Sequence, residues 1–156
     1  ANRGANGIDG VIATGAGIAE ATGRPTVLLV GDVAAVHDIG GLAAAARLGL
    51  DNLTVVLVDN DGGGIFAFLP IAGRIDEASF RELFITPHGT DLAAVATAMG
   101  YEAVDVATAR AVGEAALASP RRGPRLVRFQ TTAAATVTAM NALRAGVARV
   151  LEQPGS

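Results

Sequence analysis

The stretches TVLLVGD (residues 26–32) and LTVVLVDNDGGG (residues 53–64) decide the fold. Each is an apolar run rich in β-branched residues that ends abruptly in polar residues and glycine, which is typical of strands buried on both faces of a parallel sheet. The Ala- and Leu-rich segment 39–50 between them is expected to be a helix. Strand, helix and strand form a right-handed βαβ unit, so both strands end at the same edge of the sheet. Asp32 and Asn60 should therefore lie side by side at that carboxyl edge, where open α/β sheets bind ligands.

The residues at this edge offer oxygen ligands. Asp32 supplies a carboxylate, Asn60 supplies an amide carbonyl, and the glycines at 62–64 leave their backbone groups unshielded. Hard oxygen ligands suit Mg²⁺, which keeps coordination positions for phosphate and water. Successive backbone N–H groups can cradle an anion. The residues alone thus predict a magnesium–phosphate site.

The rest of the chain continues the alternation of strands and helices. Further strands are predicted at 101–106 and 124–130, and helices at 8–22, around 79–84, and at 91–99, 109–118 and 136–151. This order predicts an α/β fold, a doubly wound parallel sheet with helices on both faces. No linker or repeat interrupts it, so residues 1–156 are expected to form a single domain.

Composition narrows the class of protein. The 156 residues are 51% hydrophobic and 17% charged, enough for a sizeable core. A net charge of −3 without a basic stripe argues against nucleic acid. No cysteine, apolar run of membrane-spanning length or signal peptide is seen, so we expect a cytoplasmic protein with no membrane span. One group of arginines is expected to form a solvated turn: Arg121, Arg122, Arg125 and Arg128.

The two histidines carry no recognisable motif. Neither has a serine, cysteine or second ligand at a catalytic or metal-binding spacing. The place of His37, five residues after Asp32, leaves a ligand contact open for it. His88, between a proline and a glycine, is expected to be structural only. No residue of the chain is assigned as catalytic.

Three motifs in order resemble a known family. Gly31-Asp32 followed by Asn60 and Gly62 resembles the thiamine-diphosphate motif of the 2-oxoacid decarboxylase-like enzymes. The opening ANRGANGIDG (residues 1–10), GDVAAVHD (31–38) and DNDGGGIFAFLP (59–70) are very similar to the 2-succinyl-5-enolpyruvyl-6-hydroxy-3-cyclohexene-1-carboxylate synthases of menaquinone biosynthesis. The resemblance covers residues 1 to about 90 and is weak after 100.

The resemblance implies cofactors, substrates and residue roles. These enzymes use thiamine diphosphate and Mg²⁺ to decarboxylate 2-oxoglutarate and transfer the succinyl-semialdehyde unit to isochorismate, a transketolase-type C–C bond formation. Metal ligands would be Asp32, Asn60 and the Gly62 carbonyl. The cofactor would contact Ile8, Gly31, Asp32, Val33, Ala34, Asn60, Gly62, Gly63 and Ile65, and Ile8 would bend it. The substrates would contact Arg3, Phe66 and Leu69.

The sequence also departs from the family. Ala34 stands where a serine is usual, and Asp59 replaces the first asparagine of a pair. By this resemblance, residues 1–156 are expected to lack the family's pyrimidine-binding and middle domains, of which the pyrimidine-binding domain supplies an essential glutamate from a partner subunit. The chain, which does not begin with methionine, therefore resembles the diphosphate-binding domain alone. We expect it to work in a homo-oligomer and to be inactive unaided.

Three other readings remain. The chain could be a non-catalytic module that self-associates or acts as a scaffold, with the apolar segment 65–69 as an interface instead of a pocket wall. It could belong to a different thiamine-dependent 2-oxoacid decarboxylase or synthase. The third reading is a magnesium-dependent phosphate-binding domain of another kind, such as a receiver-like fold. Such a site needs a lysine, and the chain has none. Magnesium-dependent binding of thiamine diphosphate separates the cofactor domain from the scaffold.

Overall fold

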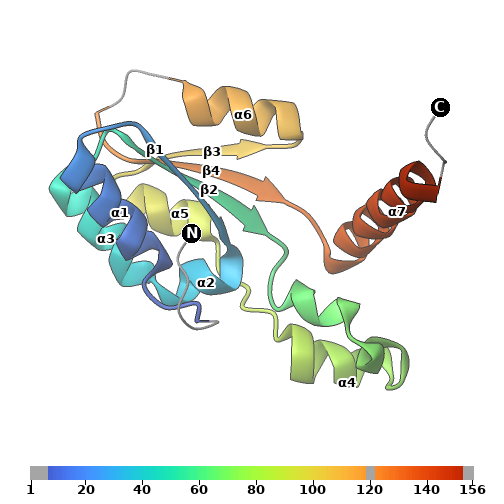
Figure 1. Cartoon of the computed structure of the whole chain (residues 1–156). Coiled ribbons are helices and arrows are strands. Elements are labelled where there is room, and N and C mark those ends of the chain that lie inside the picture. Colours follow the sequence, from blue (N-terminus) through green and yellow to red (C-terminus); the bar gives the residue numbers. More distant parts are fainter. Residues whose placement is uncertain (1–6, 119–121, 153–156) are drawn as a thin grey trace.

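A computed structural model describes residues 7–118 and 122–152. Its centre is a four-stranded parallel sheet in the spatial order β1-β2-β4-β3 (Figure 1). The strands are β1 (Thr26–Gly31), β2 (Leu53–Asp59), β3 (Glu102–Val106) and β4 (Arg125–Gln130). The predicted fold class is confirmed.

The strongest apolar run of the sequence forms an inner strand. β2 pairs with β1 on one side and β4 on the other, and its side chains are buried on both faces except for a half-buried Val58. Gly31 of β1 is in register with Val58, and Asp59 with Gln130 of β4. The three strands consequently end together, and the residues after β1 and β2 emerge at one edge.

Helices cover both faces, but unequally (Figure 1). One face carries α1 (Val11–Thr22), α3 (Ile39–Leu48) and α5 (Leu92–Ala98). The main core lies beneath them, and its fully buried side chains include Ile12, Leu42, Leu53, Leu57, Leu92 and Leu126. The opposite face carries α6 (Ala109–Leu117), which packs on a smaller cluster of Val56, Ala116 and Val127.

Short helical segments form a lobe below the carboxyl edge of the sheet (Figure 1). The lobe follows β2 and consists of η1 (Gly64–Phe68), η2 (Pro70–Gly73), α4 (Glu77–Phe80) and the π-helical turn η3 (Arg81–Ile85). The rings of Phe66, Phe80 and Phe84, exposed or half-buried, contact one another in stacked and edge-on arrangements within the lobe. A separate short helix, α2 (Asp32–His37), begins directly where β1 ends.

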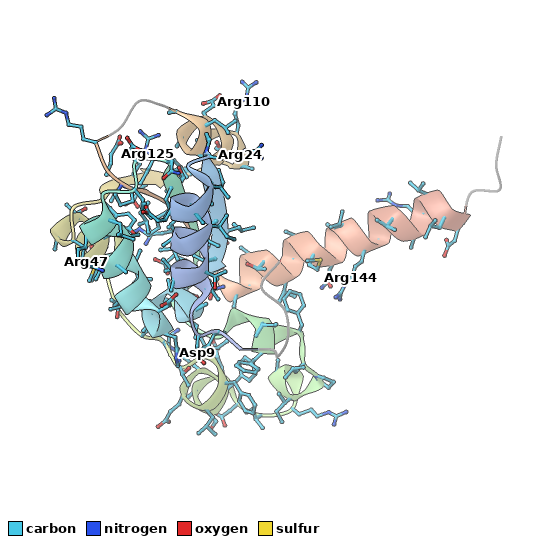
Figure 2. The ribbon with its side chains drawn as sticks, turned by 60° about the vertical axis from the view of Figure 1, so that its left-hand side comes forward. Asp9, Arg24, Arg47, Arg110, Arg125 and Arg144 are labelled. Atoms are coloured by element: carbon cyan, nitrogen blue, oxygen red, sulfur yellow. The ribbon has the colours of Figure 1, made fainter. Side chains whose placement is uncertain are left out.

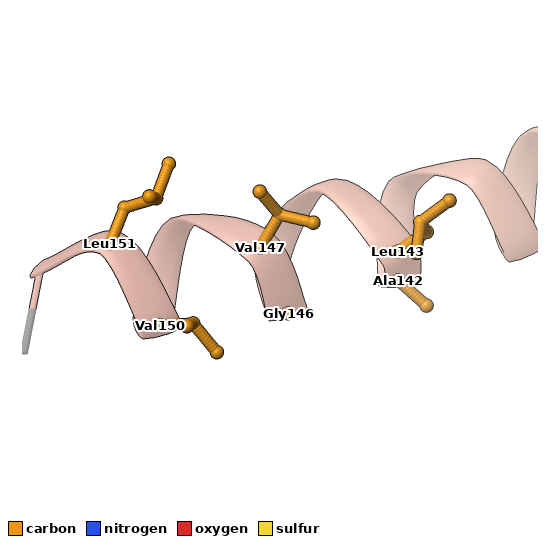
Figure 3. A pocket seen from close by; sticks show the side chains of 6 residues that line it. All are labelled: Ala142, Leu143, Gly146, Val147, Val150 and Leu151. Carbon is orange, nitrogen blue, oxygen red and sulfur yellow. The ribbon is translucent and has the colours of Figure 1, made fainter.

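The last helix, α7 (Ala133–Glu152), projects away from the sheet (Figure 1). None of its described residues is buried, and it touches the lobe, where Arg144 lies 5.7 Å from the ring centre of Phe68 (Figure 2). Its outer half presents an apolar groove lined by α7 alone (Figure 3). No helix in the described ranges is long and apolar enough to span a membrane.

Some element boundaries differ from the prediction. The first helix begins at Val11 instead of Ile8, because Gly10 takes a left-handed φ of 66° at its N-cap. The helix expected around 79–84 divides into α4 and the π-helical turn. The segment that begins at Asp32, for which no helix is predicted from the sequence, is the helix α2.

The interpretation of the arginine cluster is wrong for two of its members. Arg125 and Arg128 lie in β4 and are buried. Arg125 pairs with Glu102 at 2.8 Å and donates to the carbonyl oxygens of Ala115 and Ala118. Neighbouring strands and helix ends surround these guanidinium groups with acceptors, which a linear sequence does not reveal. Arg122 is exposed, and Arg121 lies outside the described residues.

Candidate functional site

The Asp32 carboxylate is the centre of the site. Asp32 is 3% exposed and begins α2, so its charge lies at the positive end of that short helix. Its Oδ1 accepts the Val33 N–H at 2.8 Å. Its Oδ2 accepts two N–H groups from the loop after β2, that of Asn60 at 3.0 Å and that of Gly62 at 2.9 Å. The carboxylate thus fixes the two strand ends against each other, as their spacing predicts.

The Asn60 side chain leaves a buried acceptor unused. Its Oδ1 is buried and makes no hydrogen bond within the described residues, 7–118 and 122–152. A buried amide oxygen without a partner is unfavourable unless something else binds it. Carboxylate and amide oxygens are both metal ligands of the kind that Mg²⁺ prefers. The residues present therefore fit a magnesium ion.

The glycines beside Asn60 allow three chain segments to approach closely. Gly62 has a φ of 138°, and a Cβ there would lie 2.2 Å from the Ile85 carbonyl oxygen. Gly63 donates its N–H to that same oxygen at 2.7 Å, and a Cβ on it would meet the Phe66 ring. A Cβ on Gly64 would lie 2.7 Å from the Asn60 amide nitrogen. Larger residues would push the loop away from both Asp32 and the lobe.

A cavity of about 340 Å³ opens at this edge. Mostly apolar atoms line it, with Asp32 and Asn60 as its polar groups. Its lining includes every predicted cofactor residue and one predicted substrate residue: Ile8, Gly31, Asp32, Val33, Ala34, Asn60, Gly62, Gly63, Ile65 and Phe66. Gly64 lines it too and was not predicted, although the run of three glycines could have indicated it. Leu69 is exposed outside this lining, and Arg3 lies outside the described residues.

Sequence reasoning missed His88. Its ring reaches the site from the segment after η3, and its Nε2 lies 3.4 Å from Asp32 Oδ2. Ligand atoms of Asp32, Asp59 and His88 all lie within 4.8 Å of one another. Only the tertiary fold brings His88 to Asp32, so no spacing in the sequence could have indicated it. His37 is 52% exposed, lies 3.6 Å from Asp9 and does not line the cavity.

A network of charges adjoins the cavity on the β4 side. Burial raises the pKa of Asp59, opposed by the Asp61 N–H that it accepts. Arg128 makes two hydrogen bonds to the Asp105 carboxylate at 2.7 and 2.9 Å and one to Asp91 at 2.9 Å, and lies 3.7 Å from Asp59. These hydrogen bonds lower the pKa of Asp105 and raise that of Arg128. With its donors engaged by carboxylates, Arg128 acts as a structural cation.

The family model of the thiamine pyrophosphate enzyme C-terminal TPP binding domain matches residues 3–129. The chain belongs to this family. Thiamine pyrophosphate (TPP) is another name for thiamine diphosphate. The match spans almost the whole sheet and all of the cavity lining, so the cavity at the carboxyl edge of β1 and β2 lies within the matched domain.

Curated relatives confirm the resemblance to the synthases. A 2-succinyl-5-enolpyruvyl-6-hydroxy-3-cyclohexene-1-carboxylate synthase of Myxococcus xanthus is 54% identical over 100 residues, which are 64% of this chain and 17% of the relative. The synthase of Chloroflexus aurantiacus is 45% identical over 130 residues, 83% of this chain and 22% of the relative. The TPP-binding domain thus spans about a fifth of these relatives' length.

Solved structures of TPP-dependent enzymes share the fold. Benzoylformate decarboxylase from Polynucleobacter necessarius superposes with a TM-score of 0.63 at 20% identity, covering 78% of this chain and 23% of that one. The Rhodococcus jostii RHA1 thiamine diphosphate-dependent 4-hydroxybenzoylformate decarboxylase gives 0.62 at 24% identity, with the same coverages. At these identities the likeness concerns the fold.

Proposed function

We propose that the chain is the magnesium- and diphosphate-binding part of a thiamine-diphosphate-dependent synthase that decarboxylates 2-oxoglutarate and adds the succinyl-semialdehyde unit to isochorismate. The observation that carries the proposal is the buried Asn60 Oδ1, which has no partner among the described residues; Asn60 and Asp32 line the same cavity in a TPP-binding domain. The relatives' shared synthase name supports the reaction.

The proposed roles follow from the chemistry of each group. Asp32, Asn60 and the Gly62 carbonyl would hold Mg²⁺, which would grip the diphosphate. Gly31, Val33, Ala34 and Gly63 would border the diphosphate, and Ile8 and Ile65 would pack on the apolar part of the cofactor. Phe66, Leu69 and Arg3 would contact substrate; the guanidinium of Arg3 suits a carboxylate. Bound thiamine diphosphate would supply the electron sink for decarboxylation.

The proposal includes a partner. In the family that the chain resembles, a glutamate from the pyrimidine-binding domain of another subunit completes the cofactor site. No carboxylate of this chain is assigned that role. We therefore propose a cytoplasmic homo-oligomer, or assembly with a chain bearing that domain, and no turnover by this chain alone.

Titration of thiamine diphosphate by calorimetry, with and without MgCl₂, tests the proposed function. Saturable binding should require Mg²⁺ in the wild type and be lost in Asp32→Ala. Asp51→Ala, at an exposed turn before β2, serves as the control and should bind as the wild type does. Binding that is unaffected by Asp32→Ala or by chelation of Mg²⁺ would contradict the proposal.

One observation favours a second candidate, a scaffold without catalysis. The sheet face beside α6 leaves Val27 and Leu29 exposed, and α7 carries an apolar groove. Large exposed apolar areas mark interaction surfaces. If a well-folded sample binds no thiamine diphosphate at any magnesium concentration, either the site forms only against the partner's pyrimidine-binding domain or this reading replaces the first.

A further inference from the structure

Two buried side-chain atoms lack a hydrogen-bond partner in residues 7–118 and 122–152, and both belong to residues that contact the Asp32 carboxylate. One is Asn60 Oδ1, which the proposed metal would bind, and the other is His88 Nε2. The His88 side chain is only 13% exposed. A buried donor without an acceptor is unfavourable, so the position of this imidazole calls for a role beyond filling space.

A hydrogen bond to the His88 ring determines which ring nitrogen carries the hydrogen. Nδ1 of His88 accepts the Thr90 backbone N–H at 3.0 Å, so in the neutral ring the hydrogen is on Nε2. That N–H lies 3.4 Å from Asp32 Oδ2, just beyond a well-formed hydrogen bond. The positive edge of the imidazole is therefore next to the central carboxylate.

The two oxygens of Asp32 have different surroundings. Oδ2 accepts the N–H groups of Asn60 and Gly62 and has His88 Nε2 beside it. Among the residues that the structure describes, Oδ1 accepts only the N–H of Val33, the next residue in the chain. Donors gathered on Oδ2 orient the carboxylate so that Oδ1 keeps a lone pair for a cation.

The backbone sets the position of the ring independently of Asp32. The Ile85 carbonyl accepts the Gly63 N–H at 2.7 Å, and the Gly89 N–H donates to Asp61 Oδ1 at 2.8 Å. These bonds clamp segment 85–90 to the loop that carries Asn60 and Gly62. Thr86 within the segment has a φ of 44°, a conformation that non-glycine residues rarely adopt and that persists where surrounding contacts hold it.

We propose that His88 is a positioning residue that keeps its Nε2–H beside Asp32 Oδ2 and holds the carboxylate with Oδ1 free to bind Mg²⁺. The inference rests on the proposed function. Groups that orient a metal ligand typically contribute 10–100-fold to metal affinity. Loss of this donor should therefore weaken magnesium binding by about tenfold or more while leaving the sheet intact.

Two amide variants separate the ring's two nitrogens. His88→Gln places an amide N–H near the position of Nε2, whereas His88→Asn places a polar atom near Nδ1 and no donor toward Asp32. MgCl₂ is titrated calorimetrically at a fixed saturating concentration of thiamine diphosphate. Hydrogen exchange of the Asn60 and Gly62 amides, without metal or cofactor, gives a second readout. His37→Ala is the control, because His37 is exposed and outside the cavity.

The expected pattern is specific. His88→Asn should weaken magnesium binding by about tenfold or more and speed exchange at Asn60 and Gly62. His88→Gln should stay within about threefold of the wild type, and His37→Ala should match the wild type. Equal affinity in His88→Asn and wild type, or an equal loss in Gln and Asn, would overturn the positioning role. Failure of the wild type itself to bind would instead count against the proposed function, and the exchange rates at Asn60 and Gly62 would then decide the positioning role alone.

Discussion

Gly62 meets two constraints that only glycine satisfies. Its φ of 138° is unfavourable for any side chain, and a Cβ would lie 2.2 Å from the Ile85 carbonyl oxygen. Gly62→Ala should therefore lower the free energy of unfolding by about 3 kcal/mol or more, measured by urea titration. Gly17→Ala is the matched control: Gly17 is exposed within α1 with nothing near its Cβ position, so helix propensity predicts a gain of about 0.5–1 kcal/mol. Similar effects of the two substitutions would contradict this account.

Individual site residues were predictable where they follow a strand directly. Asp32 and Asn60 come at the ends of two apolar runs, and parallel strands that are neighbours must deliver such residues to one edge. His88 approaches Asp32 through the path of the lobe, which no periodicity encodes. The burial of Arg125 and Arg128 could not be predicted either, because their carboxylate partners come from other elements that only the tertiary fold brings near.

At the scale of elements, Asp38 joins α1 to the α2–α3 junction. Its Oδ2 accepts the N–H of Ala13 in the first turn of α1 at 2.8 Å, and the residue is buried. Gly41 leaves room for this carboxylate, because a Cβ there would lie 2.8 Å from both of its oxygens. Asp38→Ala leaves a helix N–H unpaired and should lower the free energy of unfolding by about 1–3 kcal/mol in urea titration. The control Asp51→Ala, at an exposed position, should change the free energy of unfolding by less than about 0.5 kcal/mol. An equal loss of stability in the two variants would contradict a stabilising role of the Asp38–Ala13 hydrogen bond.

The Asp105–Arg128 pair links β3 to β4 and predicts a pH dependence. Hydrogen bonds from Arg128 lower the pKa of Asp105. A carboxyl whose folded pKa is depressed stabilises the fold above its unfolded pKa of about 3.9, and this contribution is lost as the pH falls through the folded pKa. Asp105 is more than half exposed, so Asp105→Asn should cost only about 0.5–1 kcal/mol at pH 7.

Urea titrations at a series of pH values check this. The difference between Asp105→Asn and wild type should be constant from pH 7 down to about 5 and shrink below about 4. Asp51→Asn should follow the wild type throughout. A difference that widens on acidification has the wrong sign and would contradict the assignment.

The elements themselves were predictable to different degrees. β2 and β1 are continuous apolar runs bounded by glycine or polar residues, so both their existence and their order could be read from the sequence. The lobe was harder to predict from the sequence. Its segments η1, η2, α4 and η3 are too short to show a repeating pattern of hydrophobic residues. Its shape depends instead on tertiary contacts such as the Phe66, Phe80 and Phe84 rings.

At the scale of the whole molecule, the apolar surface is distributed unevenly. Three helices cover one sheet face, whereas α6 covers only part of the other and leaves Leu29 of β1 69% exposed. α7 adds exposed Leu143, Val147 and Val150 (Figure 3). This chain matches about a fifth of the length of these relatives. Apolar surface of this extent is typical of a surface that packs against another protein part. The sequence indicated a sizeable apolar content but not which side chains the fold leaves exposed.

This surface predicts self-association of the isolated chain. The mass by size-exclusion chromatography with light scattering should rise above 15.6 kDa as concentration increases. Leu143→Gln with Val147→Gln should weaken association by about tenfold or more, since burial of one such side chain contributes about 1.5–3 kcal/mol. Stability should hardly change, because α7 buries none of its described residues. Arg149→Gln on the same helix tests whether apolar area or charge is responsible and should leave association unaltered. A monomer at every concentration would contradict the predicted self-association. A double variant that associates like the wild type would show that α7 is not the association surface and would leave the sheet face around Leu29 to be tested.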